Sequence, residues 1–425
     1  MFFTKIPSFK KATEKKKIKI AQRPNYVYIP LVNQDDENIT RLVKKGDYIY
    51  KGQSVGRRKG NLRIPIPSSA SGTVIGFEEH TYLNGKKVKC VVIENDFKEK
   101  TERRLGVKKD LTKFTKEEFI ERLQEMGIVG MGGTGFPTYV KYNTNKKIHT
   151  LIINAVECEP YITADFALLK EHVEEILEAI DAVMEICHID ETLIAVKKGN
   201  TELIELLSNF VGTYLKIKIA PVSNGYPSGW EKGLVYQLKR VSYQVTSVER
   251  GIIVSNVSTM YAIYEALKYH APLTERVVTF TGEMLKDPQN IQVKIGTKVS
   301  DVIETIGGYH KGEDLYFVAG GPMMGKSLPD DDLVVSANLN CVLVLPKQKE
   351  LEATTCIRCG KCVEHCPAKL SPVLIARAKG DIKKLQKLQA DRCIECGLCS
   401  YICPARINVR EKVVEAKKML EESSE

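Results

Sequence analysis

The sequence predicts a multidomain protein of mixed α/β and α+β class, and three observations lead to this prediction. Short apolar runs separated by Gly, Pro and Ser fill residues 26–97, helix and strand patterns alternate over 113–272, and eight Cys gather after residue 351. A chain of 425 residues is long enough for several domains with their own cores. Its hydrophobic content of 43% and charged content of 27% are those of an ordinary globular protein.

Both ends of the chain are basic. Residues 1–25 predict a basic arm, because the first 20 residues hold seven Lys against the single acid Glu14. Residues 356–425 hold fourteen Lys and Arg against nine Asp and Glu, so most of the net charge of +10 lies at the two ends. A basic tail of this kind favours acidic redox carriers or an anionic lipid surface. No basic motif with interleaved aromatic residues indicates nucleic-acid binding.

The sequence contains neither a membrane-spanning stretch nor a secretory signal. No stretch approaches the ~18–20 apolar residues that cross a bilayer, so a membrane role is predicted to be peripheral. No apolar core follows the basic start, as a secretory signal requires.

Residues 26–97 predict an N-terminal β domain. Two segments, 43–53 and 68–74, resemble the halves of a barrel-sandwich domain of the biotinyl and lipoyl type. In carrier domains a lysine at the hairpin tip bears the cofactor, and the segment 57–60 matches that tip poorly. A packing or docking role is therefore expected in place of a carrier role.

Residues 113–272 predict an α/β domain with a mainly parallel sheet. Thr115 and Glu118 form a capping box for a helix that ends near Met126. The expected strands are 151–154, 192–197, 215–221 and 251–256, and the expected helices are 165–187, 201–210, 231–239 and 258–269.

The remaining sequence predicts two more domains and two linkers. Residues 273–345 return to strand patterns and predict a β-grasp-like domain, and residues 351–425 contain the Cys runs. The charged segments 98–112 and 346–350 are expected to be linkers.

The Cys residues form two runs with the same spacing. The first run is Cys356, Cys359, Cys362 and Cys366 before Pro367, and the second is Cys393, Cys396, Cys399 and Cys403 before Pro404. This is the bacterial ferredoxin spacing, in which three close thiolates hold one [4Fe–4S] cluster and the fourth Cys reaches the other cluster. The expected sets are Cys356, Cys359, Cys362 and Cys403, and Cys393, Cys396, Cys399 and Cys366.

Zinc or disulfides would fit these runs less well. Zinc sites usually group two plus two ligands with longer gaps, and disulfides need an oxidising compartment. The runs therefore predict a two-[4Fe–4S] ferredoxin-like domain, and with it electron transfer.

A glycine loop lies between two predicted helices. It contains Gly130, Gly132, Gly133 and Gly135, followed by Phe136 and Pro137. Glycine lets a ring or a phosphate approach the backbone closely, although the loop alone is also consistent with a tight turn. Its place between helices makes it a poor dinucleotide-binding fingerprint.

Four motifs carry a resemblance to a known family. In order along the chain they are the segments 130–142, 154–160, 226–232 and 256–259. This order resembles the flavin- and NADH-binding subunit of respiratory complex I. With the β domain, the loop 320–325 and the Cys runs, the chain over about residues 26–410 resembles the RnfC family of the Rnf complex. That complex is a membrane ion-translocating ferredoxin:NAD oxidoreductase.

The resemblance implies the cofactors and the residues that hold them. FMN would lie on the glycine loop of Gly130, Gly132, Gly133 and Gly135, with Lys141 on its phosphate side and with hydrogen bonds from Asn154, Glu157 and Asn256. Phe136, Glu159 and Glu231 would line the pocket for NAD(H). The 273–345 segment would be an SLBB-like domain.

The function implied is an electron-transfer subunit at the cytoplasmic face of the cell membrane. Its partners would be the other Rnf-type subunits, including integral membrane ones, and ferredoxin or another redox protein. Two alternatives remain open. One is a soluble relative that reduces a corrinoid or acts in amino-acid fermentation. The other is a cluster-only relay, in which Trp230 closes the nucleotide site.

Overall fold

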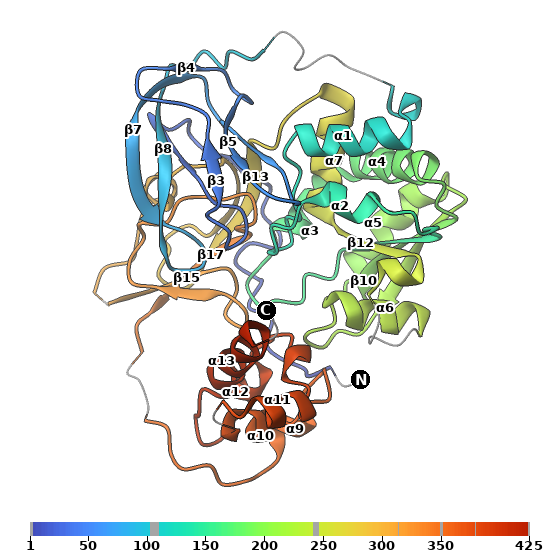
Figure 1. Ribbon diagram of the computed structural model, residues 1–425, viewed down its shortest axis with the longest axis vertical. Coiled ribbons are helices and arrows are strands. Elements are labelled where there is room, and N and C mark those ends of the chain that lie inside the picture. The colour runs from blue at the N-terminus through green and yellow to red at the C-terminus, as the bar shows by residue number, and fades with distance from the viewer. Residues whose placement is uncertain are drawn as a thin grey trace.

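The computed structural model describes residues 3–102, 110–240, 246–312, 314–348, 352–378 and 380–423. Figure 1 shows strands gathered on one side, a helix-covered sheet on the other, and a small helical domain at one end. This arrangement confirms the predicted mixture of α/β and α+β domains. Of the two predicted linkers, residues 103–109 and 349–350 lie outside the described residues.

The N-terminal β domain consists of two small sheets, with strand orders β2-β8-β7-β4 and β3-β5-β6. Its core is built by the alternate residues Val27 and Ile29 on β2, which meet Val74 and Ile93 from the neighbouring strands. Because successive side chains point to opposite faces of a strand, this alternation buries one face of the sheet. The strands are β2 (Tyr26–Pro30), β3 (Ile39–Arg41), β4 (Tyr48–Ile49), β5 (Ser54–Arg58), β6 (Pro65–Pro67), β7 (Gly72–Thr81) and β8 (Lys87–Asn95).

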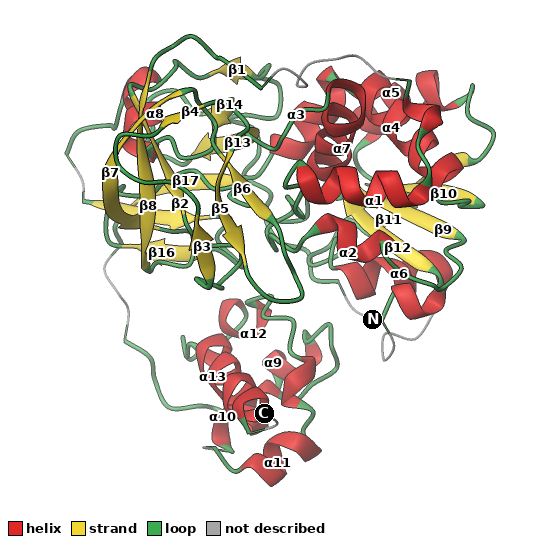
Figure 2. Cartoon of the chain, turned by 45° about the horizontal axis from the view of Figure 1, so that its top comes forward, coloured by secondary structure: helices red, strands yellow, loops and turns green. Residues whose placement is uncertain are grey.

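The α/β domain is built on a four-stranded sheet of order β11-β10-β9-β12, and every pairing in it is parallel, as predicted. Leu151 and Ile153 on β9 pack into the large core formed with α4 and α7, whereas Ile152 packs on the α6 side. Both faces of the sheet are therefore covered, as Figure 2 shows.

The elements of this domain follow the predicted order. They are α1 (Lys116–Glu125), α2 (Thr138–Tyr142), β9 (Thr150–Asn154), α3 (Ala164–Glu171), α4 (Val173–Ile186), β10 (Glu191–Lys197), α5 (Thr201–Val211), β11 (Ile217–Val222), α6 (Glu231–Lys239), β12 (Ile252–Asn256) and α7 (Val257–Tyr269). The predicted capping box of α1 is present, with Thr115 and Glu118 bonding reciprocally.

One predicted helix is wrong in extent. The single helix expected over 165–187 is two helices, α3 and α4, which meet at His172. The backbone of His172 leaves the helical region, with φ −131° and ψ 37°. Its ring contacts Tyr261 on α7, with ring centroids 4.5 Å apart. The apolar stripe continues across this break, so periodicity alone could not reveal it.

The β-grasp-like region is a six-stranded sheet of order β1-β14-β13-β17-β15-β16. One helix, α8, packs on its core through Val299, Val302 and Ile303. The elements are β13 (Glu275–Thr281), β14 (Gln289–Lys294), α8 (Val299–Thr305), β15 (Leu315–Ala319), β16 (Lys326–Leu328) and β17 (Cys341–Pro346).

The predicted basic arm contributes a strand to this sheet. β1 (Lys19–Ile20) pairs in parallel with β14 at its edge. Earlier in the arm, Thr4 forms a bridge with Tyr226 of the α/β domain. The arm thus runs along domains that come much later in the sequence.

The C-terminal domain is small and helical, and it contains both Cys runs. Its core is formed by Ile375, Leu385, Val413 and Leu420. The helices are α9 (Lys361–Glu364), α10 (Pro372–Arg377), α11 (Ile382–Lys387), α12 (Leu398–Tyr401) and α13 (Val409–Glu422). Three 3₁₀ turns complete the described helices, at Leu111–Lys113, Val248–Arg250 and Ala390–Arg392. Within the described part of the chain, no helix has the length and apolar character needed to span a bilayer.

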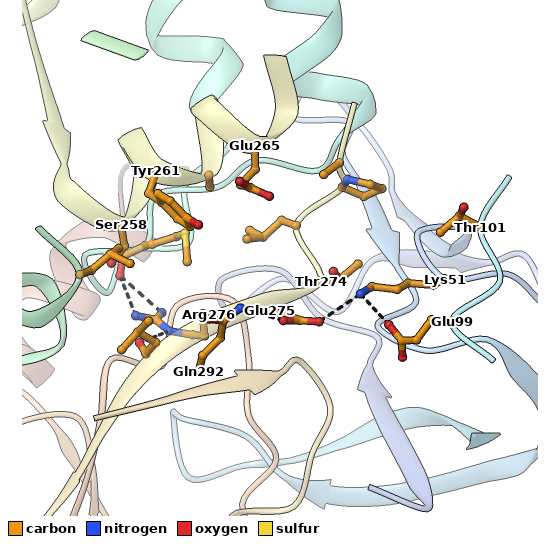
Figure 3. Close-up of a pocket in the computed structure, with 17 residues that line it drawn as sticks. Lys51, Glu99, Thr101, Ser258, Tyr261, Glu265, Thr274, Glu275, Arg276 and Gln292 are labelled. Atoms are coloured by element: carbon orange, nitrogen blue, oxygen red, sulfur yellow. Dashed lines mark hydrogen bonds and ion pairs between the residues drawn. The ribbon is translucent and has the colours of Figure 1, made fainter. Parts of the chain in front are cut away.

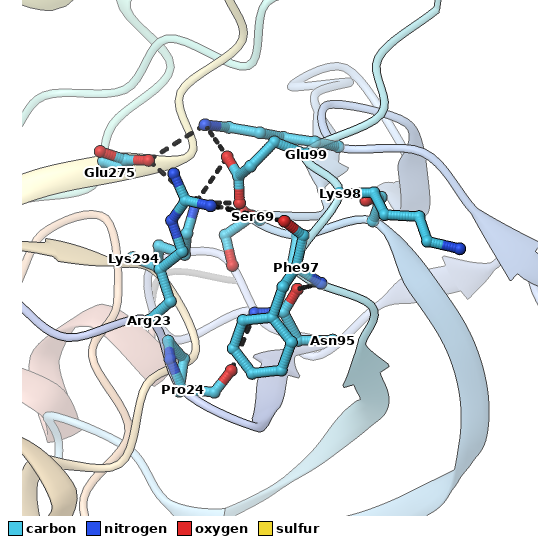
Figure 4. Close-up of polar contacts among 12 residues, drawn as sticks. Arg23, Pro24, Ser69, Asn95, Phe97, Lys98, Glu99, Glu275 and Lys294 are labelled. Carbon is cyan, nitrogen blue, oxygen red and sulfur yellow. Dashed lines mark hydrogen bonds and ion pairs between the residues drawn. The ribbon is translucent and has the colours of Figure 1, made fainter.

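An ionic cluster joins the N-terminal β domain to the β-grasp-like sheet (Figures 3 and 4). Lys51 Nζ lies 2.8 Å from a Glu99 oxygen and 3.1 Å from Glu275 Oε1, and Lys294 Nζ lies 3.0 Å from each carboxylate. Burial alone would raise the pKa of Glu275, but Lys294 and Lys51 outweigh it and lower this pKa to about 2. Beside this cluster, a cavity of about 340 Å³ lies between α7 and β13.

We expect Lys294→Met to destabilise the interface between these two domains. The Lys294 side chain is only 9% exposed, so its loss leaves two carboxylates with Lys51 as their remaining ammonium partner. Breaking a buried ion pair from one side costs about 3 kcal/mol. Urea-induced unfolding followed by circular dichroism measures this loss. Lys286→Met, at an exposed position in the same domain, is the control, and an equal loss in both variants would contradict the prediction.

Candidate functional site

A cavity of about 710 Å³ lies between the α/β domain, the loop 320–325 and the C-terminal domain. Most of the cofactor residues predicted from the sequence line it. They are Gly130, Gly132, Gly133, Lys141, Asn154, Glu157, Glu159, Glu231 and Asn256. Gly135 and Phe136 are not among its lining residues.

The glycine loop is closed by its own backbone hydrogen bonds. Gly130 N–H donates to Phe136 O at 2.8 Å, and Gly135 N–H donates to the Gly130 carbonyl at 3.0 Å. Gly133 has φ +114°, and a Cβ added to it would meet no atom within 4 Å. The Gly135 carbonyl instead accepts from Asn33 Nδ2 of the N-terminal domain. The loop therefore presents Gly132 and Gly133 to the cavity and uses Gly135 to contact another domain.

Two asparagines mark the carboxyl edge of the parallel sheet. Asn154 ends β9 and Asn256 ends β12, and the two residues are directly paired in register. Asn154 Nδ2 donates to the Gly229 carbonyl at 2.8 Å, and Asn256 caps α7. In open α/β sheets, ligands bind in the crevice beyond the carboxyl ends of the strands.

Lys141 reaches the same edge from α2. Its Nζ donates to the Val254 carbonyl at 2.9 Å and lies 3.6 Å from Glu231 Oε2. Trp230 is in the cavity wall at the N-terminus of α6. The cavity keeps its volume with this indole in place, so Trp230 does not fill it.

Glu157 and Glu159 are two largely buried carboxyl residues among those that line the cavity. Burial raises the pKa of each to about 7. Glu157 Oε1 accepts from the Asp165 backbone N–H at 2.9 Å. Glu159 Oε1 accepts from the N–H groups of Met323 and Met324, whereas its Oε2 is buried without a hydrogen-bond partner among the residues that the structure describes.

The residues of the second Cys set lie close together. Cys366, Cys393, Cys396 and Cys399 line one small apolar cavity, although Cys366 belongs to the first run. In the other set, the Cys362 thiol lies close enough to interact electrostatically with those of Cys359 and Cys403. Within the described residues, no three His, Cys, Asp or Glu side chains are close enough to hold a single metal ion.

The second Cys set adjoins the large cavity. Cys396 and Ile394 line it together with the glycine loop and Asn154. Tyr226 Oη donates to the Cys396 carbonyl at 2.8 Å, and both residues are buried. In the other set Cys359 is exposed, so one set lies beside the cavity and the other reaches the surface.

Sequence reasoning missed several residues of this site. Lys10 donates to Glu157, Asp165 accepts from Asn256 Nδ2 at 2.6 Å, and Tyr226 contacts the second Cys set. These contacts join residues far apart in the chain, and no local spacing signals them.

The volume and the lining residues of the cavity fit a flavin mononucleotide. Its volume is in the ~300–1,000 Å³ range of small-molecule sites. The open side of Gly133 gives a ligand close access to the backbone, and Lys141 in the cavity wall supplies an ammonium group for a phosphate. The gathered thiols of the second set fit the ligand type of an iron–sulfur cluster.

We expect the stability of the flavin-free protein to fall as pH rises from about 4.5 to 7. Glu157 and Glu159 keep their protons in the folded state over this window, whereas an unfolded Glu, with a pKa of 4.5, releases its proton. Glu159→Gln should therefore be more stable than the unsubstituted protein at pH 8, on the order of 1–3 kcal/mol, and equal to it near pH 4.

Thermal unfolding measured across this pH range tests the prediction. Glu185→Gln, at an exposed position on α4, is the matched control and should leave the pH profile unchanged. A Glu159→Gln profile parallel to that of the unsubstituted protein would contradict it.

Four family models match successive parts of the chain. Residues 4–98 match the RnfC barrel sandwich hybrid domain, and residues 123–265 match the Nuo51 FMN-binding domain. Residues 277–327 match the SLBB domain, and residues 355–407 match the 4Fe-4S dicluster domain. These matches confirm the four predicted kinds of domain, and they support FMN and two [4Fe–4S] clusters as the cofactors.

Curated relatives are similar over most of the chain. The C subunit of the Na(+)-translocating ferredoxin:NAD(+) oxidoreductase complex of Acetobacterium woodii is 33% identical over 376 residues, which are 87% of this chain and 85% of that protein. Its counterpart in the proton-translocating ferredoxin:NAD(+) oxidoreductase complex of Clostridium ljungdahlii is 32% identical over 86% of this chain and 81% of that protein. The counterpart in the ion-translocating oxidoreductase complex of Klebsiella pneumoniae is 36% identical over 82% of this chain, and the match spans 47% of that protein.

A solved structure shares the fold. The crystal structure of NAD+-reducing [NiFe]-hydrogenase in the H2-reduced state matches with a TM-score of 0.50 and 15% identity, over 72% of this chain and 63% of that chain. The relatives, the ordered family models and the arrangement of the cavity and the Cys sets agree, and this chain belongs to the RnfC family of ion-translocating oxidoreductase complexes.

Proposed function

We propose that this protein passes electrons between NAD(H), FMN and two [4Fe–4S] clusters, as an electron-transfer subunit of a membrane-associated Rnf-type oxidoreductase complex. One observation carries the proposal. Cys396, in the second Cys set, lines the same cavity as Gly130, Gly132 and Asn154 of the α/β domain. An electron-transfer protein needs its cofactors side by side, and this contact supplies that arrangement.

The residues proposed to hold FMN surround the carboxyl edge of the sheet. Gly130, Gly132 and Gly133 would support it through their backbone, and Lys141 would attract its phosphate. Asn154, Glu157 and Asn256 would complete its polar contacts. Bound flavin exchanges two electrons with a nicotinamide and single electrons with iron–sulfur clusters.

The residues proposed for NAD(H) lie on another side of the cavity. Glu159 and Glu231 line it, whereas Phe136 is half-buried outside the lining residues. The aromatic ring at the mouth of the site would then be that of Trp230, which the cavity wall contains. An indole beside a cavity of this volume supports ring stacking better than closure of the site.

The positions of the two Cys sets indicate the order of the cofactors along the proposed path. Cys366, Cys393, Cys396 and Cys399 would ligate the cluster beside the flavin cavity. Cys356, Cys359, Cys362 and Cys403 would ligate the outer cluster, where the Cys359 side chain reaches solvent. Electrons would pass between the cavity and a partner at the outer set, by way of the inner cluster.

The proposed partners are the other subunits of an Rnf-type complex, integral membrane ones included, and ferredoxin or another redox protein. The names of the relatives support this assembly. The net charge of +5 over residues 356–425, fourteen basic against nine acidic residues, supports an acidic partner surface. A peripheral place on the cytoplasmic face of the membrane follows from that assembly.

Anaerobic absorbance of the reconstituted protein tests the proposal. Addition of NADH should bleach both the flavin and the cluster bands. An unchanged spectrum, with dithionite still reducing the clusters, would contradict NADH entry and favour the cluster-only relay. Isolation without membrane subunits, together with reduction of a soluble acceptor, would favour a soluble reductase.

We further expect Cys396→Ala to separate the two halves of the path. Loss of a ligand beside the cavity should leave flavin bleaching by NADH within about twofold and slow cluster reduction at least tenfold, because the inner cluster no longer links flavin to the outer one. Stopped-flow absorbance measures both rates. Cys187→Ala, outside the Cys runs, is the control. Equal cluster reduction in both variants would contradict this path.

A further inference from the structure

A lysine of the N-terminal arm contacts Glu157, one of the residues that line the cavity. Lys10 Nζ donates to the Glu157 carbonyl at 2.7 Å and to the Ile162 carbonyl at 2.5 Å, and it lies 3.4 Å from Glu157 Oε2. The two side chains are only 14% and 9% exposed. Hydrogen bonds from a charged donor in such a buried place are stronger than neutral ones.

The arm is fixed on both sides of Lys10. Before it, Thr4 forms a bridge with Tyr226, and the Ser8 carbonyl accepts from Tyr161 N–H at 2.8 Å. After it, Thr13 is fully buried and accepts from Thr163 Oγ1 at 2.7 Å. The contacts on both sides of Lys10 therefore fix the position of its backbone.

The backbone of Glu157 explains what this ammonium does. Glu157 has φ +40°, in the left-handed region that residues other than Gly adopt at a cost. Its carbonyl accepts from Lys10 and, at 3.4 Å, from Lys197. Two largely buried lysine side chains thus donate to the carbonyl of a residue in this costly conformation.

Glu157 is connected to Asn256 through hydrogen bonds with Asp165. Its Oε1 accepts from the Asp165 N–H at 2.9 Å. The Asp165 carboxylate in turn accepts from Asn256 Nδ2 at 2.6 Å and from the Ser258 hydroxyl at 2.5 Å. An unbroken series of contacts therefore runs from Lys10 through Glu157 and Asp165 to Asn256.

We propose that Lys10 is a positioning residue for the flavin site: it holds Glu157 in its left-handed conformation and, through Asp165, orients the amide of Asn256. This inference rests on the proposed binding of FMN in the cavity that Glu157 and Asn256 line. Lys10 does not line the cavity itself, so it acts through Glu157.

The affinity of the full-length, flavin-free protein for FMN tests the role. We expect Lys10→Met to raise the FMN dissociation constant about tenfold, measured by quenching of flavin fluorescence. Lys10→Arg should restore most of the affinity, because a guanidinium still donates to the two carbonyls. Lys11→Met, one residue along and exposed, is the matched control and should bind FMN like the unsubstituted protein.

A double-mutant comparison distinguishes positioning from a general loss of structure. If Lys10 acts through Glu157, the variant carrying both Lys10→Met and Glu157→Gly should bind FMN within about twofold of Glu157→Gly alone, because glycine adopts the left-handed conformation without help and lacks the carboxyl group that reaches Asp165. The iron content and cluster absorbance of all variants should stay unchanged.

Three results would overturn the inference. They are unchanged FMN affinity in Lys10→Met, effects of the two substitutions that multiply, and equal losses in Lys10→Met and Lys11→Met. Failure of the unsubstituted protein to bind FMN would overturn the proposed function as well, so the two failures can be told apart.

Discussion

Parallel pairing of β9 with β12 is the constraint on which the site depends. It sets Asn154 opposite Asn256 at the carboxyl edge of the sheet, and β12 passes directly into α7 at Asn256. β9 is buried on both faces, with Leu151 and Ile152 in different clusters. A slip of one residue would exchange those faces and separate the two asparagines. The glycine loop and Cys396 of the second Cys set line the same cavity as these two asparagines.

Chemistry coded in local spacing could be predicted from the sequence, and chemistry built from distant contacts could not. The Cys spacing, the capping box at Thr115 and the order of the strands along the chain needed only short segments. The break at His172 escaped prediction, because a ring contact with Tyr261 accompanies it while the apolar stripe continues. The sequence shows Lys10 only as one of several lysines in a basic arm. Its hydrogen bond to Glu157, which is 147 residues away, has no local signal. Gly135 lies outside the cavity lining, where Asn33 of another domain contacts its carbonyl.

The buried carboxylates fall into two kinds with different uses. Glu275 is held between two ammonium groups, and its charge is balanced where the N-terminal domain meets the β-grasp-like sheet. Glu159 has one oxygen bonded to two backbone N–H groups and the other buried with no hydrogen-bond partner in the described part of the chain. The first arrangement favours rigid docking of domains. The second is unfavourable for folding alone, and such local conflicts are expected where function, not stability, selects the residue.

The position of the arm also has a consequence for the order in which the protein is completed. The ribosome makes this segment before the residues that it contacts, which lie at Glu157, Tyr226 and β14. At roughly 5–20 residues per second, synthesis reaches β14 only about 15–60 s after the arm. During that time the arm has no complete docking surface, because its edge strand β1 has no β14 to pair with. The arm can therefore complete its contacts only after most of the chain has been synthesised.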